Sequence, residues 1–289
     1  MSEYKKSVVI TGCSHGFGFI SAKRFADENY LVFAAIRHTK DANQRAKSEL
    51  EAYSDNIKVI DMDVANDFSV SWAIATIYQQ TDAIDILINN AGTTCMGISE
   101  AISLSQAKKQ MEVNYFGALR TIQAVLPVMR RVGRGLIINT TAISGRIAMP
   151  FFATYNATKY ALEGYSETLH YELAPYGIDV AIVEPGPFST NLFNAMELEE
   201  YGAIVTQYDD LEKKQIKMRA SSFEDFIKNH SETDPNLVVQ AYFSLAEMAQ
   251  GQRPIRTVVG IDYGIDKLNA VSEVVQNELR QALQIERSA

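Results

Sequence analysis

Short apolar segments rich in β-branched residues alternate with helix-like segments along most of the chain. Seven of them have the length and composition of strands: Ser7–Thr11, Leu31–Ile36, Ile57–Asp61, Ile84–Asn89, Gly135–Thr140, Ile178–Glu184 and Ile255–Gly260. Continuous apolar runs are typical of strands that are buried on both faces. Because strands that alternate with helices form βαβ units, the sequence predicts an α/β fold, a doubly wound parallel sheet of about seven strands with helices on both faces.

Two helix-like segments allow more detailed predictions. Asp67–Gln80 is expected to form a helix with one buried stripe, made by its apolar residues Phe68, Trp72, Ile74, Ile77 and Tyr78. Ser103–Arg131 is long enough for a helix of many turns. Pro127 lies inside it and predicts a kink, or a break near Leu126, because proline donates no backbone hydrogen bond.

The length of 289 residues allows one large domain or two small ones, and no segment has the composition of a linker. We therefore expect a single domain over residues 1–289. Residues 187–230 interrupt the alternation and are expected to cover the substrate; a surface excursion without a role is the alternative. Residues 266–289 predict a helical tail, and packing on its own domain or on a neighbouring subunit fits equally well.

Composition excludes several classes of protein. The apolar content of 47% excludes a wholly disordered chain, and the net charge of −8 disfavours a nucleic-acid partner or an anionic membrane. No apolar stretch is long enough to span a membrane. Cys13 and Cys95 lie far apart, which excludes a disulfide framework, and the few His and Cys residues show no metal-ligand spacing. The first six residues show no signal-peptide pattern, and the scarcity of cysteines predicts a reducing cytoplasm.

A glycine-rich loop, Thr11–Gly18, follows the first strand and precedes a helix-like segment. Glycine allows a tight turn and a close approach of the backbone to a pyrophosphate, and the N-terminus of the next helix offers free N–H groups to it. The sequence therefore predicts a dinucleotide site. The loop residues expected there are Gly12, Ser14, His15, Gly16, Phe17 and Gly18.

The end of the second strand bears on the choice of dinucleotide. A site for NAD normally places an acidic residue there, whereas this chain has Ile36 followed by Arg37. Arginine pairs with a ribose 2′-phosphate, which favours NADP(H), and His15 could contribute to the same pocket. Asp63 follows the third strand and could accept a hydrogen bond from the adenine amino group. Alternatively, Asp63 or Asp67 caps the next helix.

Tyr155 and Lys159 are four residues apart in a helix-like stretch, so their side chains share one face. A phenol with a pKa near about 10 is a poor base at neutral pH, and a nearby ammonium group favours the phenolate. The pair is therefore a candidate acid/base device.

These motifs occur together with Asp63-Val64, Asn89-Asn90-Ala91-Gly92, Asn114 and Pro185-Gly186, over roughly Ser7–Gly260. In this order and spacing the chain resembles the single-domain branch of the short-chain dehydrogenase/reductase family, whose members have a Rossmann-type fold. The resemblance implies an oxidoreductase in which Tyr155 is the acid/base, Lys159 holds the nicotinamide ribose and lowers the pKa of Tyr155, and Asn114 holds a water of a proton relay. For Asn114, an amide that caps a helix irregularity is an alternative compatible with that role.

The resemblance also extends the cofactor site. The residues it implies beside adenosine, ribose and nicotinamide are Val64, Asn90, Ala91, Gly92, Pro185, Gly186, Phe188 and Thr190. Family members usually form homodimers or homotetramers through two long helices, here Ser103–Arg131 and Tyr155–Pro175.

The chain departs from the family at one catalytic position. The family places a serine 13 residues before the tyrosine, and this chain has Ala142 there. Alanine cannot donate a hydrogen bond to the substrate oxygen. Three interpretations remain open: Thr141 or Ser144 supplies the hydroxyl through a shifted loop, the enzyme is weak, or the protein binds the cofactor without turnover.

Side chains near the expected chemistry are mostly apolar. The residues proposed for the substrate pocket are Thr94, Met96, Met149, Phe152 and Phe193, although core packing could account for part of this set. The sequence thus predicts an NADP(H)-dependent oxidoreductase that interconverts a carbonyl and a secondary alcohol on an apolar small molecule. The alternative is a non-catalytic or weakened NADP(H)-binding regulatory or scaffold protein, which Ala142 favours.

Overall fold

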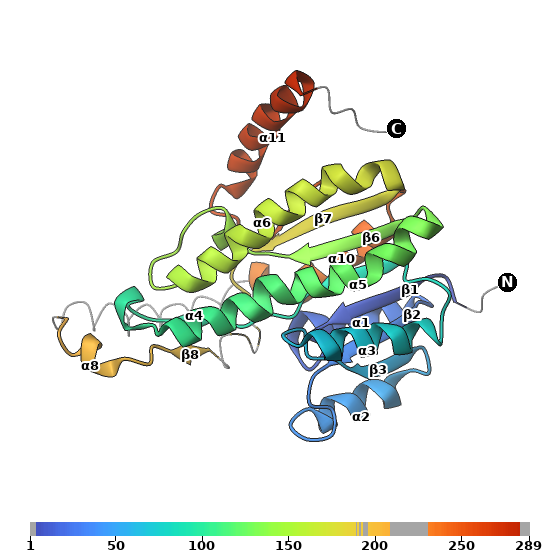
Figure 1. Cartoon of the computed structure of the whole chain (residues 1–289), viewed down its shortest axis with the longest axis horizontal. Coiled ribbons are helices and arrows are strands. Elements are labelled where there is room, and N and C mark those ends of the chain that lie inside the picture. Colours follow the sequence, from blue (N-terminus) through green and yellow to red (C-terminus); the bar gives the residue numbers. More distant parts are fainter. Residues whose placement is uncertain (1–3, 189, 191, 193–195, 209–230, 284–289) are drawn as a thin grey trace.

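A computed structural model describes residues 4–188, 190, 192, 196–208 and 231–283. Seven parallel strands form one sheet in the order β3-β2-β1-β4-β6-β7-β9 (Figure 1). Their bounds are β1 Ser7–Thr11, β2 Leu31–Ile36, β3 Ile57–Asp61, β4 Ile86–Asn89, β6 Gly135–Thr140, β7 Ile178–Pro185 and β9 Arg256–Val259. The predicted Rossmann-type, doubly wound sheet is confirmed. The strand order reverses between β1 and β4, the position at which such sheets bind ligands.

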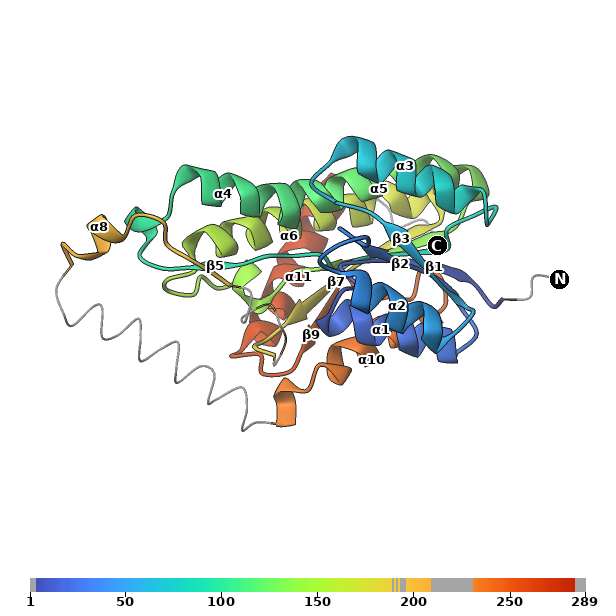
Figure 2. The same cartoon turned by 90° about the horizontal axis from the view of Figure 1, so that it is seen from below.

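Helices cover both faces of the sheet (Figure 2). One face packs against α1 Gly16–Asp27, α2 Gln44–Tyr53 and α10 Asn236–Glu247, and the other against α3 Asp67–Tyr78, α5 Gly117–Val132 and α6 Ala153–Leu173. Alternate residues of the inner strands enter the two cores. Val8 and Ile10 of β1 face the α1 side, whereas Val9 between them faces the α3 side. This division explains why the inner strands carry apolar residues at consecutive positions rather than at alternate ones.

The edge strand β3 and the helix after it differ from the prediction. Burial on both faces is wrong for β3, whose Lys58 and Asp61 are not buried, because β3 has a neighbour on one side only. The stripe predicted for α3 is also partly wrong. Phe68 and Trp72 are 78% and 55% exposed, and the stripe that packs on the sheet consists of Val70, Ala73, Ile74 and Ile77.

The predicted break near Leu126 is wrong. Helix α5 runs through Pro127 to Val132, held by residues such as Ile122 and Val125 that pack on the sheet. The long segment is interrupted earlier. Helix α4, Leu104–Met111, passes into a π-helical turn, Glu112–Phe116, before α5 begins.

Beyond β7, the chain leaves the sheet and returns. Strand β8, Glu197–Leu198, pairs with β5, Cys95–Met96, and the short helix α8, Gly202–Val205, follows. Residues 209–230 of the predicted cover lie outside the described part of the chain. The predicted tail helix is α11, Ile265–Ala282, and short 3₁₀ turns complete the described elements: Ser99–Ala101, Ile143–Gly145, Ala174–Tyr176 and Ser231–Thr233. Within the described ranges, no helix combines the length and apolar character needed to cross a membrane.

Candidate active site

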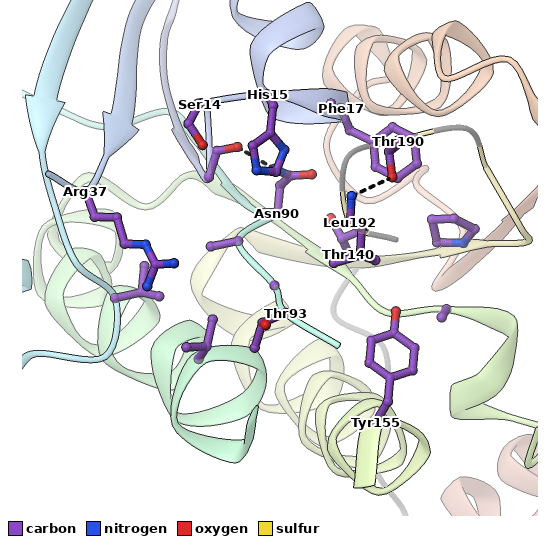
Figure 3. A pocket seen from close by; sticks show the side chains of 18 of the residues that line it. Ser14, His15, Phe17, Arg37, Asn90, Thr93, Thr140, Tyr155, Thr190 and Leu192 are labelled. Carbon is purple, nitrogen blue, oxygen red and sulfur yellow. Dashed lines mark hydrogen bonds between the residues drawn. The ribbon is translucent and has the colours of Figure 1, made fainter. Parts of the chain in front are cut away.

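A cleft opens where the strand order reverses, at the carboxyl ends of β1, β2, β4, β6 and β7. The predicted cofactor residues that line it are Gly12, Ser14, His15, Gly16, Phe17, Arg37, Asp63, Val64, Asn90, Ala91, Gly92, Tyr155, Lys159, Pro185, Gly186, Phe188 and Thr190. Gly18 does not line it. Arg37 lies at one end of the cleft and Tyr155 at the other (Figure 3). Segments far apart in sequence thus meet in one groove.

The glycine loop needs glycine for two different reasons. Gly12 and Gly16 have φ of +73° and +59°, which disfavour any residue with a Cβ atom. Gly18 has no such φ, but a Cβ atom there would lie 2.5 Å from the carbonyl oxygen of Gly12, so Gly18 packs helix α1 against the loop. The first residues of α1 receive no side-chain cap from His15. Their N–H groups are therefore available to an anion at the helix N-terminus.

Hydrogen bonds from Thr11 and Asn90 join β1 to the loop after β4. The Thr11 hydroxyl oxygen accepts from the backbone N–H groups of Asn90 and Ala91, each at 3.0 Å. The Asn90 amide Nδ2 donates to the Thr11 carbonyl oxygen at 2.8 Å. These bonds fix the floor of the cleft and engage the backbone N–H and the side-chain Nδ2 of Asn90.

The guanidinium of Arg37 is the positive group at the end of β2. Arg37 is exposed and extends into the cleft, on the same side as Ser14 and His15 (Figure 3). Burial and the nearby Arg37 charge lower the pKa of His15. The acidic residue at the end of β3, Asp61, is already engaged, because its carboxylate accepts from the Thr39 hydroxyl at 2.5 Å. This end of the cleft therefore favours an anionic group.

Asp63 lines the cleft, but it does not cap α3. Its Oδ1 accepts from the N–H of Ala65 at 3.0 Å. The cap is Asn66, whose side-chain oxygen accepts from Ser69 N at 2.8 Å. The suggestion that Asp63 or Asp67 caps the helix is thus wrong, because Asn66 occupies the capping position.

Tyr155 and Lys159 lie on the cleft side of α6, as their spacing predicts. Lys159 Nζ donates to the Thr140 carbonyl oxygen at 2.9 Å and lies 5.5 Å from the centre of the Tyr155 ring. Burial lowers the pKa of Lys159 to about 8 and raises the pKa of the Tyr155 phenol. The shift of the Tyr155 pKa is opposite to the one expected from a nearby ammonium group, and its cause is desolvation by burial.

Asn114 sits in the π-helical turn and is fully buried. Its Oδ1 accepts from Thr93 N at 2.8 Å, and its Nδ2 donates to the Thr93 carbonyl at 2.9 Å and to the Thr158 hydroxyl at 3.0 Å. The side chain therefore joins the turn to the loop after β4 and to α6. The sequence suggested instead that this amide caps a helix irregularity, but these three bonds go to other segments of the chain.

The missing serine leaves a small apolar wall. Ala142 lines the cleft and starts the turn Ile143–Gly145. The Thr141 hydroxyl donates to Glu163 Oε1 at 2.6 Å and also lies 3.1 Å from the Val183 carbonyl oxygen. Ser144 is buried with its hydroxyl unpaired and does not line the cleft. Among the described residues, no hydrogen bond reaches the Tyr155 hydroxyl.

The prediction of the substrate-pocket residues is less successful than that of the cofactor residues. Thr94, Met96, Met149 and Phe152 do not line the cleft, and Phe193 lies outside the described residues. Thr94 and Met96 are buried, whereas the Phe152 ring contacts the edge of the Tyr155 ring, with centres 6.4 Å apart.

The sequence analysis missed several lining residues, among them Lys109 and Glu197. These two form an ion pair that joins α4 to β8 at the cleft. They are 88 residues apart, and no motif in the sequence connects them.

The sequence profile of short chain dehydrogenases matches residues 6–200. The chain belongs to the short-chain dehydrogenase family. Its relatives are dehydrogenases and reductases, so it is an oxidoreductase with a nucleotide-binding Rossmann fold. A 3-ketodihydrosphingosine reductase of Bacteroides thetaiotaomicron is 34% identical over 211 residues, which cover 73% of this chain and 74% of the relative.

Two further comparisons extend over more of the chain. The mitochondrial D-beta-hydroxybutyrate dehydrogenase of Mus musculus is 32% identical over 82% of this chain and 72% of its own length. The crystal structure of a short-chain dehydrogenase from Streptomyces avermitilis is 30% identical, has a TM-score of 0.74, and covers 97% of this chain and 98% of its own. Structures that share the fold at 24% and 19% identity were solved with NADP⁺ and with NAD, so a nicotinamide cofactor is common to both.

Proposed function

We propose that this short-chain dehydrogenase uses NADP(H) to interconvert a carbonyl and a secondary alcohol on an apolar small molecule. The observation that carries the proposal is that Tyr155 and Lys159 share one cleft with the glycine loop. A nucleotide bound along the loop would extend toward Tyr155, at the far end from Arg37 (Figure 3). Acid/base chemistry and cofactor binding therefore meet at one place.

The preference for NADP(H) rests on Arg37, because the fold neighbours carry both kinds of cofactor. Arg37 is exposed at the end of β2, and within the described chain no carboxylate forms an ion pair with it. Ser14 and His15 lie on the same side of the cleft (Figure 3). A ribose 2′-phosphate would meet a guanidinium, a hydroxyl and an imidazole there, whereas an acidic residue that would select unphosphorylated ribose is missing.

In the proposed reduction, the bound nicotinamide supplies a hydride to the carbonyl carbon. The Tyr155 hydroxyl points into the cleft and donates its proton to the carbonyl oxygen as negative charge develops there. Burial raises the pKa of Tyr155, so the phenol is protonated and ready to act as an acid. In the reverse direction, the phenolate must be stabilised by positive charge, which Lys159 supplies when it is protonated.

Lys159 has the right properties to return a proton to Tyr155. Its pKa of about 8 allows it to gain and lose a proton near neutral pH. Gly92, Asn114 and Lys159 adjoin one another, since a Cβ atom on Gly92 would lie 3.5 Å from Asn114 Oδ1 and 3.9 Å from Lys159 Nζ. A water held near Asn114 would connect Lys159 with solvent.

Ala142 weakens this site in our proposal. Thr141 uses its hydroxyl on Glu163, and the Ser144 hydroxyl is buried away from the cleft, so neither side chain replaces the serine. Loss of one such donor costs about a hundredfold to a thousandfold in turnover at comparable sites. The same observation favours the second candidate, a protein that binds NADP(H) for regulation or as a scaffold and turns nothing over.

An apolar substrate is supported by the lining near Tyr155. Ala142 and Leu192 contribute apolar surface to the cleft, and neither belongs to the residues proposed for the cofactor. One relative is named for 3-ketodihydrosphingosine and another for D-beta-hydroxybutyrate, so the relatives alone do not choose the substrate class. The two buried, free cysteines fit a reducing compartment such as the cytoplasm.

The direct test is to mix the purified protein with NADPH and a panel of apolar ketones and to follow the absorbance of the reduced nicotinamide. We expect slow turnover with at least one ketone, and none for Tyr155→Phe, which should still bind NADPH. Tight NADPH binding without turnover of any ketone, either in the wild type or in Ala142→Ser, would leave the non-catalytic candidate instead.

A further inference from the structure

Helix α11 turns polar side chains toward the domain and leaves its large apolar side chains exposed to solvent, among other polar residues. Its half-buried residues after the first are Asn269, Ser272, Gln276 and Arg280, which recur at intervals of three and four. Six large apolar residues here are between 38% and 64% exposed. Five of them form what we call the α11 stripe, Leu268, Val271, Val275, Leu279 and Leu283, and Val274 lies beside it. This arrangement is the reverse of a helix that packs on its own domain.

The inward contacts of α11 are specific. Arg146 donates to Asn269 Oδ1 at 3.0 Å and to the Ser272 hydroxyl at 2.7 Å. Asn269 Nδ2 also donates to Glu184 Oε2 at 2.5 Å. Farther along, the Arg280 guanidinium lies 4.9 Å from the centre of the Tyr171 ring. These polar contacts hold the helix in one orientation, in which the side chains of the α11 stripe stay exposed beside them.

The stripe has the spacing of a helix–helix interface. Leu268, Val271, Val275 and Leu279 follow one another at intervals of three, four and four residues, so they form one continuous row on the helix. Helix α11 stands out from the body of the molecule beyond α6 (Figure 1). A row of large apolar side chains on a projecting helix is unusual for a monomer and marks an interaction site.

We propose that α11 pairs in antiparallel orientation with α11 of a second copy of this chain. The argument for this occupant is charge complementarity along one flank of the stripe. Lys267 and Glu278 are both exposed there, eleven residues or three helical turns apart, and neither forms an ion pair within the described chain. In a two-fold antiparallel pair, the same flank of both helices meets. Lys267 of each copy then lies opposite Glu278 of the other copy, so the pair of helices has two such ion pairs.

The same register matches the apolar residues. Leu268 and Leu279 are also eleven residues apart, so the register that joins Lys267 to Glu278 of the second copy sets Leu268 near its Leu279 and Val271 near its Val275. An interface made by one patch with itself is what two-fold symmetry requires. Because its own domain already orients α11, little further ordering is needed on association.

A lipid surface is a poorer occupant of the stripe. The exposed charged residues of α11 are Asp266, Lys267, Glu273 and Glu278, more acidic than basic, and the whole chain carries a net charge of −8. Helices that lie on membranes usually carry basic residues beside their apolar face, which attract anionic lipid. The flank of α11 lacks this feature.

The test is sedimentation of the full chain across a wide concentration range at low salt, with charge-swap variants. We expect Lys267→Glu and Glu278→Lys each to weaken one association step about tenfold, because each replaces two attractions with two repulsions. The double variant K267E/E278K exchanges both charges, so it should recover wild-type assembly to within about threefold. Val271→Asp should abolish the same step while circular dichroism shows an unchanged helix content.

Each other outcome contradicts the proposal. A wild type that stays monomeric at every concentration would exclude the second copy. Assembly that none of the variants alters would place the interface elsewhere, including on the long helices typical of the family. Flotation with phosphatidylcholine/phosphatidylserine vesicles that Val271→Asp abolishes, without a change in assembly, would identify a lipid surface as the occupant. None of these measurements depends on the proposed catalysis.

Discussion

The hydroxyl of Thr141 donates a hydrogen bond of 2.6 Å to Oε1 of Glu163, directly beside the position where this family places its catalytic serine. Glu163 lies four residues after Lys159 on α6, is almost fully buried, and also accepts from Arg256 Nε at 3.0 Å. Thr141 lines the cleft, but its hydroxyl belongs to a hydrogen-bond network with Glu163 and Arg256. In our proposal, this bond is the reason that Thr141 does not replace the hydroxyl of the missing serine.

Restoring the serine should raise activity. Ala142→Ser supplies a donor at the wall of the cleft, and we expect kcat to rise about a hundredfold while the Kd for NADPH stays unchanged. Steady-state kinetics and a fluorescence titration of NADPH measure the two effects. Ser144→Ala is the matched control, because it removes the neighbouring hydroxyl that does not line the cleft, and it should leave kcat within about twofold. An unchanged kcat in Ala142→Ser would contradict the idea of a missing donor.

Thr141→Val should act on stability rather than on turnover. The variant leaves the buried Glu163 without one donor, so the free energy of unfolding should fall by about 1–3 kcal/mol in urea titrations. Thr141→Ser keeps the hydroxyl and should preserve most of the stability. A hundredfold loss of kcat in Thr141→Val at unchanged stability would instead assign the missing hydroxyl to Thr141.

Glu184 should make stability fall as pH rises. Burial, chiefly, and the neighbouring Glu163 raise the pKa of Glu184 from 4.5 to about 8. The folded state thus binds more protons than the unfolded state between these values, and the contribution of this group is present at low pH and lost as pH rises through about 8. Urea unfolding between pH 5 and 8.5 should show a flatter profile for Glu184→Gln than for the wild type. The exposed control Glu172→Gln should keep the wild-type slope of unfolding free energy against pH. If Glu184→Gln also kept the wild-type slope, Glu184 would not be the source of the pH dependence.

Arg37 should set the choice of cofactor. Arg37→Ala removes the charged donor at the end of β2, so the Kd for NADPH should rise about tenfold or more while the Kd for NADH changes little. Isothermal titration with both cofactors measures this. Lys40→Ala, which removes another exposed cation from the same loop, is the control and should change neither Kd much. Equal weakening of both cofactors by Arg37→Ala would contradict recognition of a 2′-phosphate.

Short sequence motifs were enough to predict the parts of the cleft that come from one turn or one helix. The Thr11–Gly18 loop and the Tyr155–Lys159 pair each lie within one turn or one helix, so their geometry follows from neighbouring residues. The strands could be recognised for a similar reason, since an inner parallel strand must be apolar on both faces. The exposed Phe68 and Trp72 could not be placed, because side-chain type alone does not tell which face of α3 meets the sheet.

Features that depend on distant residues were not predictable. The ion pair of Lys109 and Glu197 joins elements 88 residues apart, and the network around Glu163 joins α6 to β9 through Arg256. The continuation of α5 past Pro127 depends on packing against the sheet, which outweighs one lost hydrogen bond. The prediction of the substrate-pocket residues was wrong for the same reason. Thr94 and Met96 closely follow Thr93, which lines the cleft, but the fold buries their side chains in the interior.

The central claim is that Tyr155 promotes hydride transfer from NADPH to an apolar ketone in this cleft. The most direct measurement uses NADPH deuterated at the transferred position and mass spectrometry of the product. The account predicts an alcohol with one deuterium on the carbinol carbon from the wild type, more of it from Ala142→Ser, and none above background from Tyr155→Phe. Equal deuterated product from the wild type and Tyr155→Phe, or no deuterated product from any of the three proteins with NADPH bound, would contradict it.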